Sequence, residues 1–105
     1  MARRRIFVDK SELVLIVPSD GRTATYNLVS SHINRIAFEP CEEFLLGFIP
    51  QKSEKITIVA SNTPDGVVYT RNTNKAYFDT YKEELRQFAK ENRIPFTDDT
   101  QSTEQ

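Results

Sequence analysis

The sequence predicts a mainly β domain, in which seven antiparallel strands wind into a barrel or sandwich that one C-terminal helix closes. Two observations predict this fold. Up to residue 71, short segments rich in Val, Ile, Phe, Tyr and Thr alternate with Pro, Gly, Asp, Asn and Ser, the pattern of strands joined by turns. After residue 74 the apolar residues change to a spacing of three and four, which is typical of an amphipathic helix. At 105 residues the chain has the length of one domain.

The predicted strands are joined by connections too short for crossover helices, which favours antiparallel pairing. Their expected ranges are residues 5–9, 12–17, 22–29, 33–39, 43–49, 55–60 and 66–70. The strongest hairpin signal lies at residues 18–21, because Gly21 accepts a positive φ angle without a steric clash. We expect Pro40 to end the fourth strand and residues 50–54 to form a polar turn.

The predicted helix, residues 74–92, has one apolar stripe. The stripe consists of Phe78, Tyr81, Leu85 and Phe88, with Ala89 beside them. Because an isolated helix of this length is marginal in water, the stripe should cover an opening of the barrel. We expect an Asn or Thr among residues 72–74 to cap the start of the helix, and residues 92–95 to end it. Residues 1–96 therefore form one domain, and residues 97–105 are expected to be a disordered polar tail.

This order of elements, over residues 5–92, resembles the pleckstrin-homology-like superfold, in particular its minimal bacterial domains. The resemblance lies in element order and spacing rather than in a motif. Relatives that bind lipid headgroups have a first hairpin loop crowded with Lys and Arg, whereas residues 9–12 here are charge-balanced, and the chain has no Trp. The resemblance implies a groove between the fifth strand and the C-terminal helix, where a peptide can add a strand.

The charge balance excludes several classes of partner. Fourteen Lys and Arg against fifteen Asp and Glu give a net charge of −1, so the chain lacks the positive field that duplex DNA or an anionic membrane requires.

The longest apolar stretch, residues 13–17, is far short of the ~20 residues of a membrane-spanning helix. The apolar run after Arg5 ends at Asp9, so we expect no signal peptide. A single cysteine, Cys41, excludes an intramolecular disulfide, and we expect a soluble, cytoplasmic protein.

Candidate catalytic groups are weakly supported. His32 follows Ser30 and Ser31, but nothing there resembles a nucleophile elbow, and a turn histidine is the favoured interpretation. The three glycines stand far apart, so the chain has no phosphate-binding loop. The arginines at residues 3–5 could contact a phosphate, although charges near a terminus more often only promote solubility.

A metal site is weakly supported as well. His32 and four residues that follow it could in principle supply metal ligands. These four are Glu39, Cys41, Glu42 and Glu43. A single histidine and the absence of metal-ligand spacing favour a solvated acidic strand junction instead. We therefore expect no enzyme activity, no cofactor and no metal.

The remaining functional prediction is that the protein acts by binding another protein or a second copy of itself. The fifth strand, residues 43–49, is apolar on both faces, so something should cover its second face. A peptide, a second copy of the chain or the helix alone could do so, and the sequence leaves these open. Tyr77 lies one residue off the buried stripe and is a candidate peptide anchor. The predicted partner-binding residues are Phe44, Leu46, Phe48, Tyr77, Tyr81 and Glu84.

The alternative function is a barrel that holds a small ligand or a lipid headgroup. The predicted inward residues are large and apolar, which favours a filled interior over a ligand cavity. These residues are Leu13, Leu15, Val17, Tyr26, Leu28, Ile36, Phe38, Ile56 and Ile58.

Overall fold

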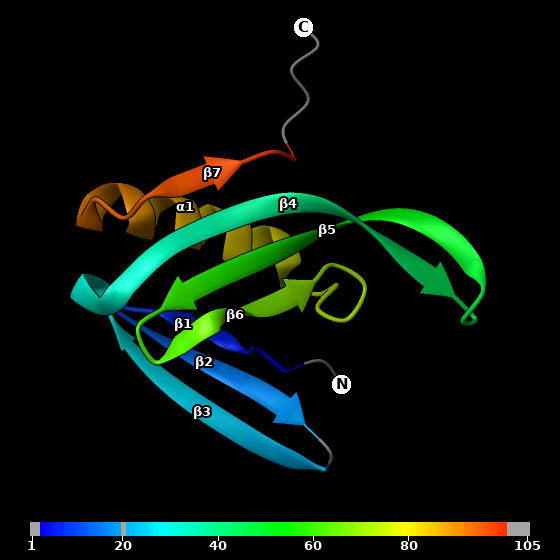
Figure 1. Ribbon diagram of the computed structural model, residues 1–105, viewed down its shortest axis with the longest axis horizontal. Coiled ribbons are helices and arrows are strands. Elements are labelled where there is room, and N and C mark those ends of the chain that lie inside the picture. The colour runs from blue at the N-terminus through cyan, green and yellow to red at the C-terminus, as the bar shows by residue number, and fades with distance from the viewer. Residues whose placement is uncertain (1–2, 20, 101–105) are drawn as a thin grey trace, which may run out of the picture.

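The computed structural model describes residues 3–19 and 21–100, which form two β-sheets and one helix (Figure 1). The first sheet contains β1 (Ile6–Val8), β2 (Glu12–Ser19) and β3 (Arg22–Val29), in that order and all antiparallel. The predicted β2–β3 hairpin is confirmed: Ser19 pairs with Arg22, and Gly21 has a φ of 76°. Asp20, which the predicted turn includes, lies outside the described residues.

The second sheet has the order β6-β5-β4-β7 and follows a short 3-10 turn, η1 (Ser30–His32). Its strands are β4 (Ile33–Leu45), β5 (Ile49–Ala60), β6 (Thr63–Thr70) and β7 (Phe96–Asp98). Because β7 runs parallel to β4, this sheet is mixed. The predicted fold class, mainly β with one C-terminal helix, is confirmed, at 56% strand. Of the predicted barrel or sandwich, the closed barrel is wrong, because the strands form two separate sheets. The predicted number of seven strands is confirmed, but the seventh follows the helix and pairs parallel, so the expectation of antiparallel pairing throughout is wrong.

The predicted break between a fourth and a fifth strand is also wrong. β4 runs without interruption through Pro40, and the chain turns at residues 46–48 instead, so the predicted polar turn at residues 50–54 is part of β5. Pro40 pairs with Glu54 on β5 but lies beyond Phe38, the last residue of β4 that pairs with β7. One side of β4 is therefore a free edge at Pro40, where a missing N–H is tolerated.

The end of the chain also differs from the sequence prediction. Instead of a disordered tail from Thr97, β7 extends the sheet as far as Asp98. The Phe96 ring packs edge-to-face on Phe38 with the ring centroids 4.9 Å apart, and Arg86 donates to Asp98 at 2.8 Å. These two contacts supply the apolar and polar anchors that the sequence pattern does not indicate. Residues 101–105 lie outside the described part of the chain.

The helix α1 (Phe78–Asn92) begins four residues later than predicted. Tyr77 occupies the N-cap position without a side-chain cap, and the expected cap residue Asn74 instead donates its side-chain amide to the carbonyl of Thr70 at 2.9 Å. Arg93, in the left-handed region with a φ of 56°, ends the helix. The predicted stripe is confirmed, since all five of its members are buried against β1, β4 and β7.

Side chains from both sheets and the helix fill the interior. Seven of the nine predicted inward residues are fully buried, and Val17 and Tyr26 are partly buried against the same core. The hydroxyl of Tyr69 is a polar group inside this core, and it is satisfied by a hydrogen bond. It donates to the carbonyl of Ile16 at 2.9 Å, and burial raises the pKa of this phenol.

A charged cluster joins β5 to the helix. Glu54 accepts hydrogen bonds from Lys82 at 2.8 Å and from Arg71 at 3.1 Å, and Arg71 also pairs with Asp79 at 2.9 Å. Burial alone would raise the pKa of Glu54, but the hydrogen bonds from Lys82 and Arg71 outweigh it and lower this pKa below its ordinary value. A carboxylate with a depressed folded-state pKa stabilises the fold above its unfolded pKa, and this stabilisation is lost as the pH falls through the folded pKa.

We therefore expect Glu54→Gln to lower the free energy of unfolding at pH 7 by about 1 kcal/mol, allowing for the partial exposure of the cluster. The difference from the wild type should shrink as the pH falls below about 4.3, the ordinary pKa of glutamate. Urea unfolding at pH 7 and pH 3 measures both effects, with Glu12→Gln, at an exposed site, as the control. A loss that is equal at the two pH values would contradict this assignment.

Candidate functional site

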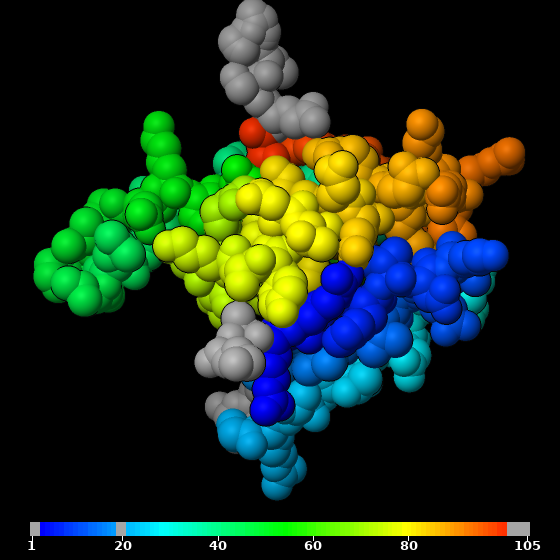
Figure 2. Space-filling model, turned by 180° about the vertical axis from the view of Figure 1, so that it is seen from behind, coloured from blue at the N-terminus to red at the C-terminus, as the bar shows by residue number. Residues whose placement is uncertain are grey.

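The β4–β5 hairpin extends beyond the rest of the sheet as an arm, residues 40–54. β6 pairs with β5 only from Lys55 onward, and β7 pairs with β4 only up to Phe38, so no third strand supports the arm. Figure 1 shows the arm curving away from both sheets, and Figure 2 shows it, in green, projecting from one side of the molecule. Two strands alone are marginally stable in water, so the arm needs other contacts.

The base of the arm is tied to the segment between β6 and α1. Besides the contacts of Glu54, the backbone N–H of Arg71 donates to the carbonyl of Glu54 at 2.9 Å. The Asn72 side chain donates to Gln51 at 3.1 Å, and the Asn72 backbone N–H donates to Glu43 at 3.2 Å. Glu43 also accepts from the Ser53 hydroxyl. These bonds fix the arm as far as Glu43 and Gln51, and only residues 44–50 extend further.

Five large apolar side chains occupy this outer end, and we call them the apolar tip. They are Phe44, Leu45, Leu46, Phe48 and Ile49, with exposed fractions of 57, 44, 83, 71 and 42%. Single exposed apolar residues are ordinary, but a contiguous group of this kind marks an interaction surface. No other feature of the described residues gathers as many exposed apolar side chains in one short segment.

The turn at the tip has an unusual backbone. Leu46 and Gly47 have φ values of 54° and 83°, and the Phe48 N–H donates to the Leu45 carbonyl at 3.1 Å. Two successive positive φ values characterise a type I′ turn, which prefers Asn and Gly. A leucine in this conformation costs roughly 1–2 kcal/mol, and Leu46 recovers nothing by burial. The fold alone gives no reason for a leucine at this position.

The predicted partner-binding residues lie in separate environments. Phe44, Leu46 and Phe48 belong to the apolar tip. Tyr81 is fully buried, and its hydroxyl accepts from the Arg5 backbone N–H at 2.6 Å. Glu84 forms an ion pair with Arg4. The structure therefore does not bring the predicted residues of the helix together with those of the arm.

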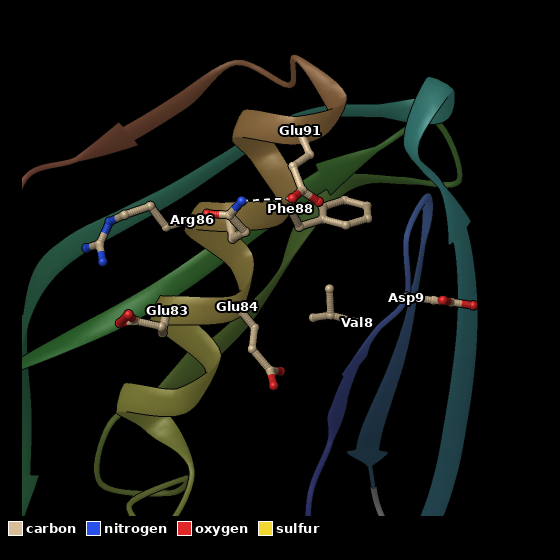
Figure 3. A pocket seen from close by; sticks show the side chains of 8 residues that line it. Val8, Asp9, Glu83, Glu84, Arg86, Phe88 and Glu91 are labelled. Carbon is tan, nitrogen blue, oxygen red and sulfur yellow. Dashed lines mark hydrogen bonds between the residues drawn. The ribbon is translucent and has the colours of Figure 1, made fainter.

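Glu84 and Tyr77 border two different surface hollows. Glu84 lines a hollow of about 430 Å³ between α1 and the end of β1, where Phe88 and Val8 face each other below Glu91 (Figure 3). Most of the charged residues of that hollow are acidic. Tyr77 lines another hollow, of about 460 Å³, together with the N-terminal arginines.

The remaining candidate groups are dispersed. His32 is exposed in η1, and Cys41 lies half-buried on the arm opposite Ser53. Burial, and the nearby Glu43, raise the pKa of the Cys41 thiol, which disfavours the reactive thiolate. Within residues 3–19 and 21–100 no group of three or more His, Cys, Asp or Glu side chains is arranged to hold a metal ion.

Comparisons with protein-family models, with curated proteins and with solved structures found no match. In the described part of the chain, α1 is too short and too polar to cross a membrane. The candidate site therefore rests on the geometry of the arm.

Proposed function

We propose that the protein is an association module that forms a two-fold dimer through its apolar tip. The observation that carries this proposal is the apolar tip itself, five exposed side chains at the end of an arm that no third strand supports. Burying this surface against a partner would remove apolar area from water, the main driving force of protein association.

A second copy of the chain matches the chemistry of the tip. In a two-fold interface the same patch meets itself, so an apolar tip finds an apolar partner. Glu42 and Lys52 lie directly opposite each other on the two strands, next to the tip. A two-fold axis can place Glu42 of one copy beside Lys52 of the other, so the charged rim is self-complementary as well. The free backbone edges on both sides of the arm offer further hydrogen bonds.

The apolar area of the tip determines how strongly the dimer is expected to associate. Its exposed fractions correspond to about three whole side chains, or on the order of 500 Å² of apolar surface per copy. Two tips would bury about 1,000 Å², at the lower end of specific interfaces, where association is weak and reversible. We therefore expect a dissociation constant between about 10 µM and about 1 mM.

Sedimentation velocity tests this proposal with the wild type, the double variant Phe44→Ser/Phe48→Ser, and Val68→Ser as the matched control. Val68 is an exposed apolar residue on β6, away from the tip. From about 10 µM to 1 mM, the wild type and Val68→Ser should shift together from monomer to dimer, and the double variant should stay monomeric.

A wild type that stays monomeric at 1 mM would contradict the proposal, as would a double variant that dimerises like the wild type. Binding of the monomer to vesicles, lost in the same double variant, would assign the tip to a membrane surface instead of a second copy. The net charge of −1 and the acidic Glu42 and Glu43 beside the tip favour the protein partner.

We also propose that the fold is a variant of the pleckstrin-homology-like superfold. The two packed sheets and the C-terminal helix support this relationship. The chain would depart from that pattern in having six strands before the helix and a parallel strand, β7, after it. The barrel that holds a small ligand or a lipid headgroup has no comparable support, because side chains fill the interior.

A further inference from the structure

The hollow beside Tyr77 is lined by arginines and an aromatic ring, and it is not part of the apolar tip. We infer that it binds an acidic segment of a partner protein that carries a large apolar or aromatic side chain. We call this hollow the arginine pocket. This inference is independent of dimerisation, because none of its residues belongs to the arm.

Three parts of the chain build the arginine pocket. The segment before β1 runs beside the end of β2, where the Arg5 carbonyl accepts from the Ile16 N–H, and it shares the lining of the pocket with β3 and with the turn before α1. In Figure 2 these N-terminal residues, in blue, run directly below the yellow residues of that turn. The pocket has a volume of about 460 Å³ and is lined by Arg3, Arg4, Arg5, Ile16, Pro18, Thr23, Thr73, Asn74 and Tyr77. A neighbouring hollow of about 380 Å³ shares Arg5, Pro18, Thr73 and Asn74 with it.

The charge of the pocket is positive and only partly compensated. Arg4 is engaged by Glu84 and by the carbonyl of Ile6, at 2.8 Å from its Nε. Within the described residues, no carboxylate lies within ion-pair distance of the guanidinium groups of Arg3 or Arg5, and none of the lining residues is acidic. As far as the described residues show, the pocket therefore offers a ligand two cations, Arg3 and Arg5, that no carboxylate engages.

The position of Arg5 is fixed by its backbone. Its N–H donates to the Tyr81 hydroxyl at 2.6 Å, and its carbonyl accepts from the Ile16 N–H at 2.8 Å. Because the backbone of Arg5 is already fixed, binding a carboxylate costs conformational entropy only in the Arg5 side chain, and its planar guanidinium can engage both carboxylate oxygens. This segment is therefore a built part of the fold rather than a loose end.

Apolar groups border the cations. The Tyr77 ring stacks on Tyr81, with the ring centroids 6.1 Å apart and the planes at 20°, and Ile16 and Pro18 also line the pocket. Arg4 lies 5.9 Å from the Tyr81 ring, so a cation caps the same aromatic stack. A pocket that combines apolar groups with cations fits a large apolar side chain next to a carboxylate.

The polar groups of the pocket suit a peptide backbone, and its small number of cations favours a peptide over a nucleic acid. Asn74 is buried and uses its side-chain N–H to bond Thr70, which leaves its carbonyl oxygen as an acceptor. Thr23 adds a hydroxyl that can donate or accept. A peptide backbone supplies both N–H donors and carbonyl acceptors, whereas a phosphate supplies only acceptors. Two cations also match one or two carboxylates better than a polyanion, which needs several phosphate contacts.

Fluorescence anisotropy with short labelled peptides tests this inference. The probe is a blocked Glu-Glu-Phe-Glu peptide, and the matched probe is Gln-Gln-Phe-Gln. We expect the wild type to bind the acidic peptide at least tenfold more tightly than the neutral one, with an affinity that falls as salt rises. The variant Arg3→Gln/Arg5→Gln should bind the acidic peptide at least tenfold more weakly. Its fold should be retained, because the structural bonds of Arg5 are made by its backbone.

Two control variants show whether the peptide binds at the pocket rather than elsewhere on the surface. Lys10→Gln/Lys90→Gln removes the same charge at exposed sites that do not line the pocket, and it should bind the acidic peptide within twofold of the wild type. Phe44→Ser/Phe48→Ser should also bind as the wild type does, which distinguishes the pocket from the apolar tip. Equal binding of the two peptides, or no loss in Arg3→Gln/Arg5→Gln, would overturn the inference. Tighter binding of a single-stranded oligonucleotide than of the acidic peptide would overturn it in favour of a nucleic-acid ligand.

Discussion

Replacement of Leu85 by alanine is expected to lower the free energy of unfolding by about 3 kcal/mol. Leu85 is completely buried at the centre of the apolar stripe of α1, between Tyr81 and Phe88. Removing its branched end takes away apolar contacts and leaves a cavity that the close-packed surroundings fill only in part. The helix covers both sheets, so the loss should affect the whole domain.

Denaturant unfolding of the isolated chain, at a concentration low enough to keep it monomeric, measures this effect. Leu45→Ala removes the same atoms at an exposed position of the apolar tip and should cost less than about 1 kcal/mol. Comparable losses at the two positions would show that the helix does not hold the sheets together.

Replacement of Leu46 by asparagine is expected to have opposite effects on folding and on association. Asparagine tolerates a positive φ, so the variant should gain about 1 kcal/mol of stability, or ~5 °C in the melting temperature of the monomer. The same change removes the most exposed apolar side chain of the tip from both copies of the dimer. The dimer should therefore dissociate at least tenfold more readily.

Thermal unfolding at about 1 µM and sedimentation at about 1 mM measure the two effects separately, since the expected dimer is largely dissociated at the lower concentration. Leu45→Asn is the control, because Leu45 lies in the strand and not among the residues with positive φ. It should weaken the dimer without raising the melting temperature. A lower melting temperature for Leu46→Asn would contradict the positive φ assigned to this residue. An unchanged dimer would contradict the role assigned to the tip.

Elements with a strong local pattern could be predicted from the sequence. The stripe of α1 has helical spacing over three turns, and the β2–β3 turn has Gly21 where a positive φ is required. The full length of β4 could not be predicted, because Pro40 resembles a strand end although an unpaired edge tolerates proline. β7 could not be predicted because it has only three residues and depends on Phe38 and Arg86, which are distant in the sequence.

The candidate site could be predicted in part. The apolar excess of residues 43–49 indicates an uncovered surface, and Phe44, Leu46 and Phe48 are exposed. The sequence pattern places that excess in a strand, because a leucine before Gly47 is not a recognised turn signal. Only the resemblance to the pleckstrin-homology-like superfold implies that this strand lies beside the helix. The arginine pocket forms only when the N-terminal segment meets the turn before α1, so no local pattern indicates that Tyr77 and Arg5 line one pocket.

A dimer joined at the arms would carry two arginine pockets. A partner with two acidic segments could then engage both, and the second contact would form at the high effective concentration of a tethered ligand. Weak individual contacts would in this way give a much tighter assembly. The two proposed sites are physically separate, so either could be removed by substitution while the other is retained.

Hydrogen exchange of the backbone amides at residues 44–50, followed by mass spectrometry at about 1 µM and at about 1 mM, tests the role of the arm most directly. We expect these amides to exchange more slowly at the higher concentration, while those of the β2–β3 turn and of α1 keep their rates. If the exchange rates of residues 44–50 did not depend on protein concentration, the proposal that the arm joins two copies would be contradicted.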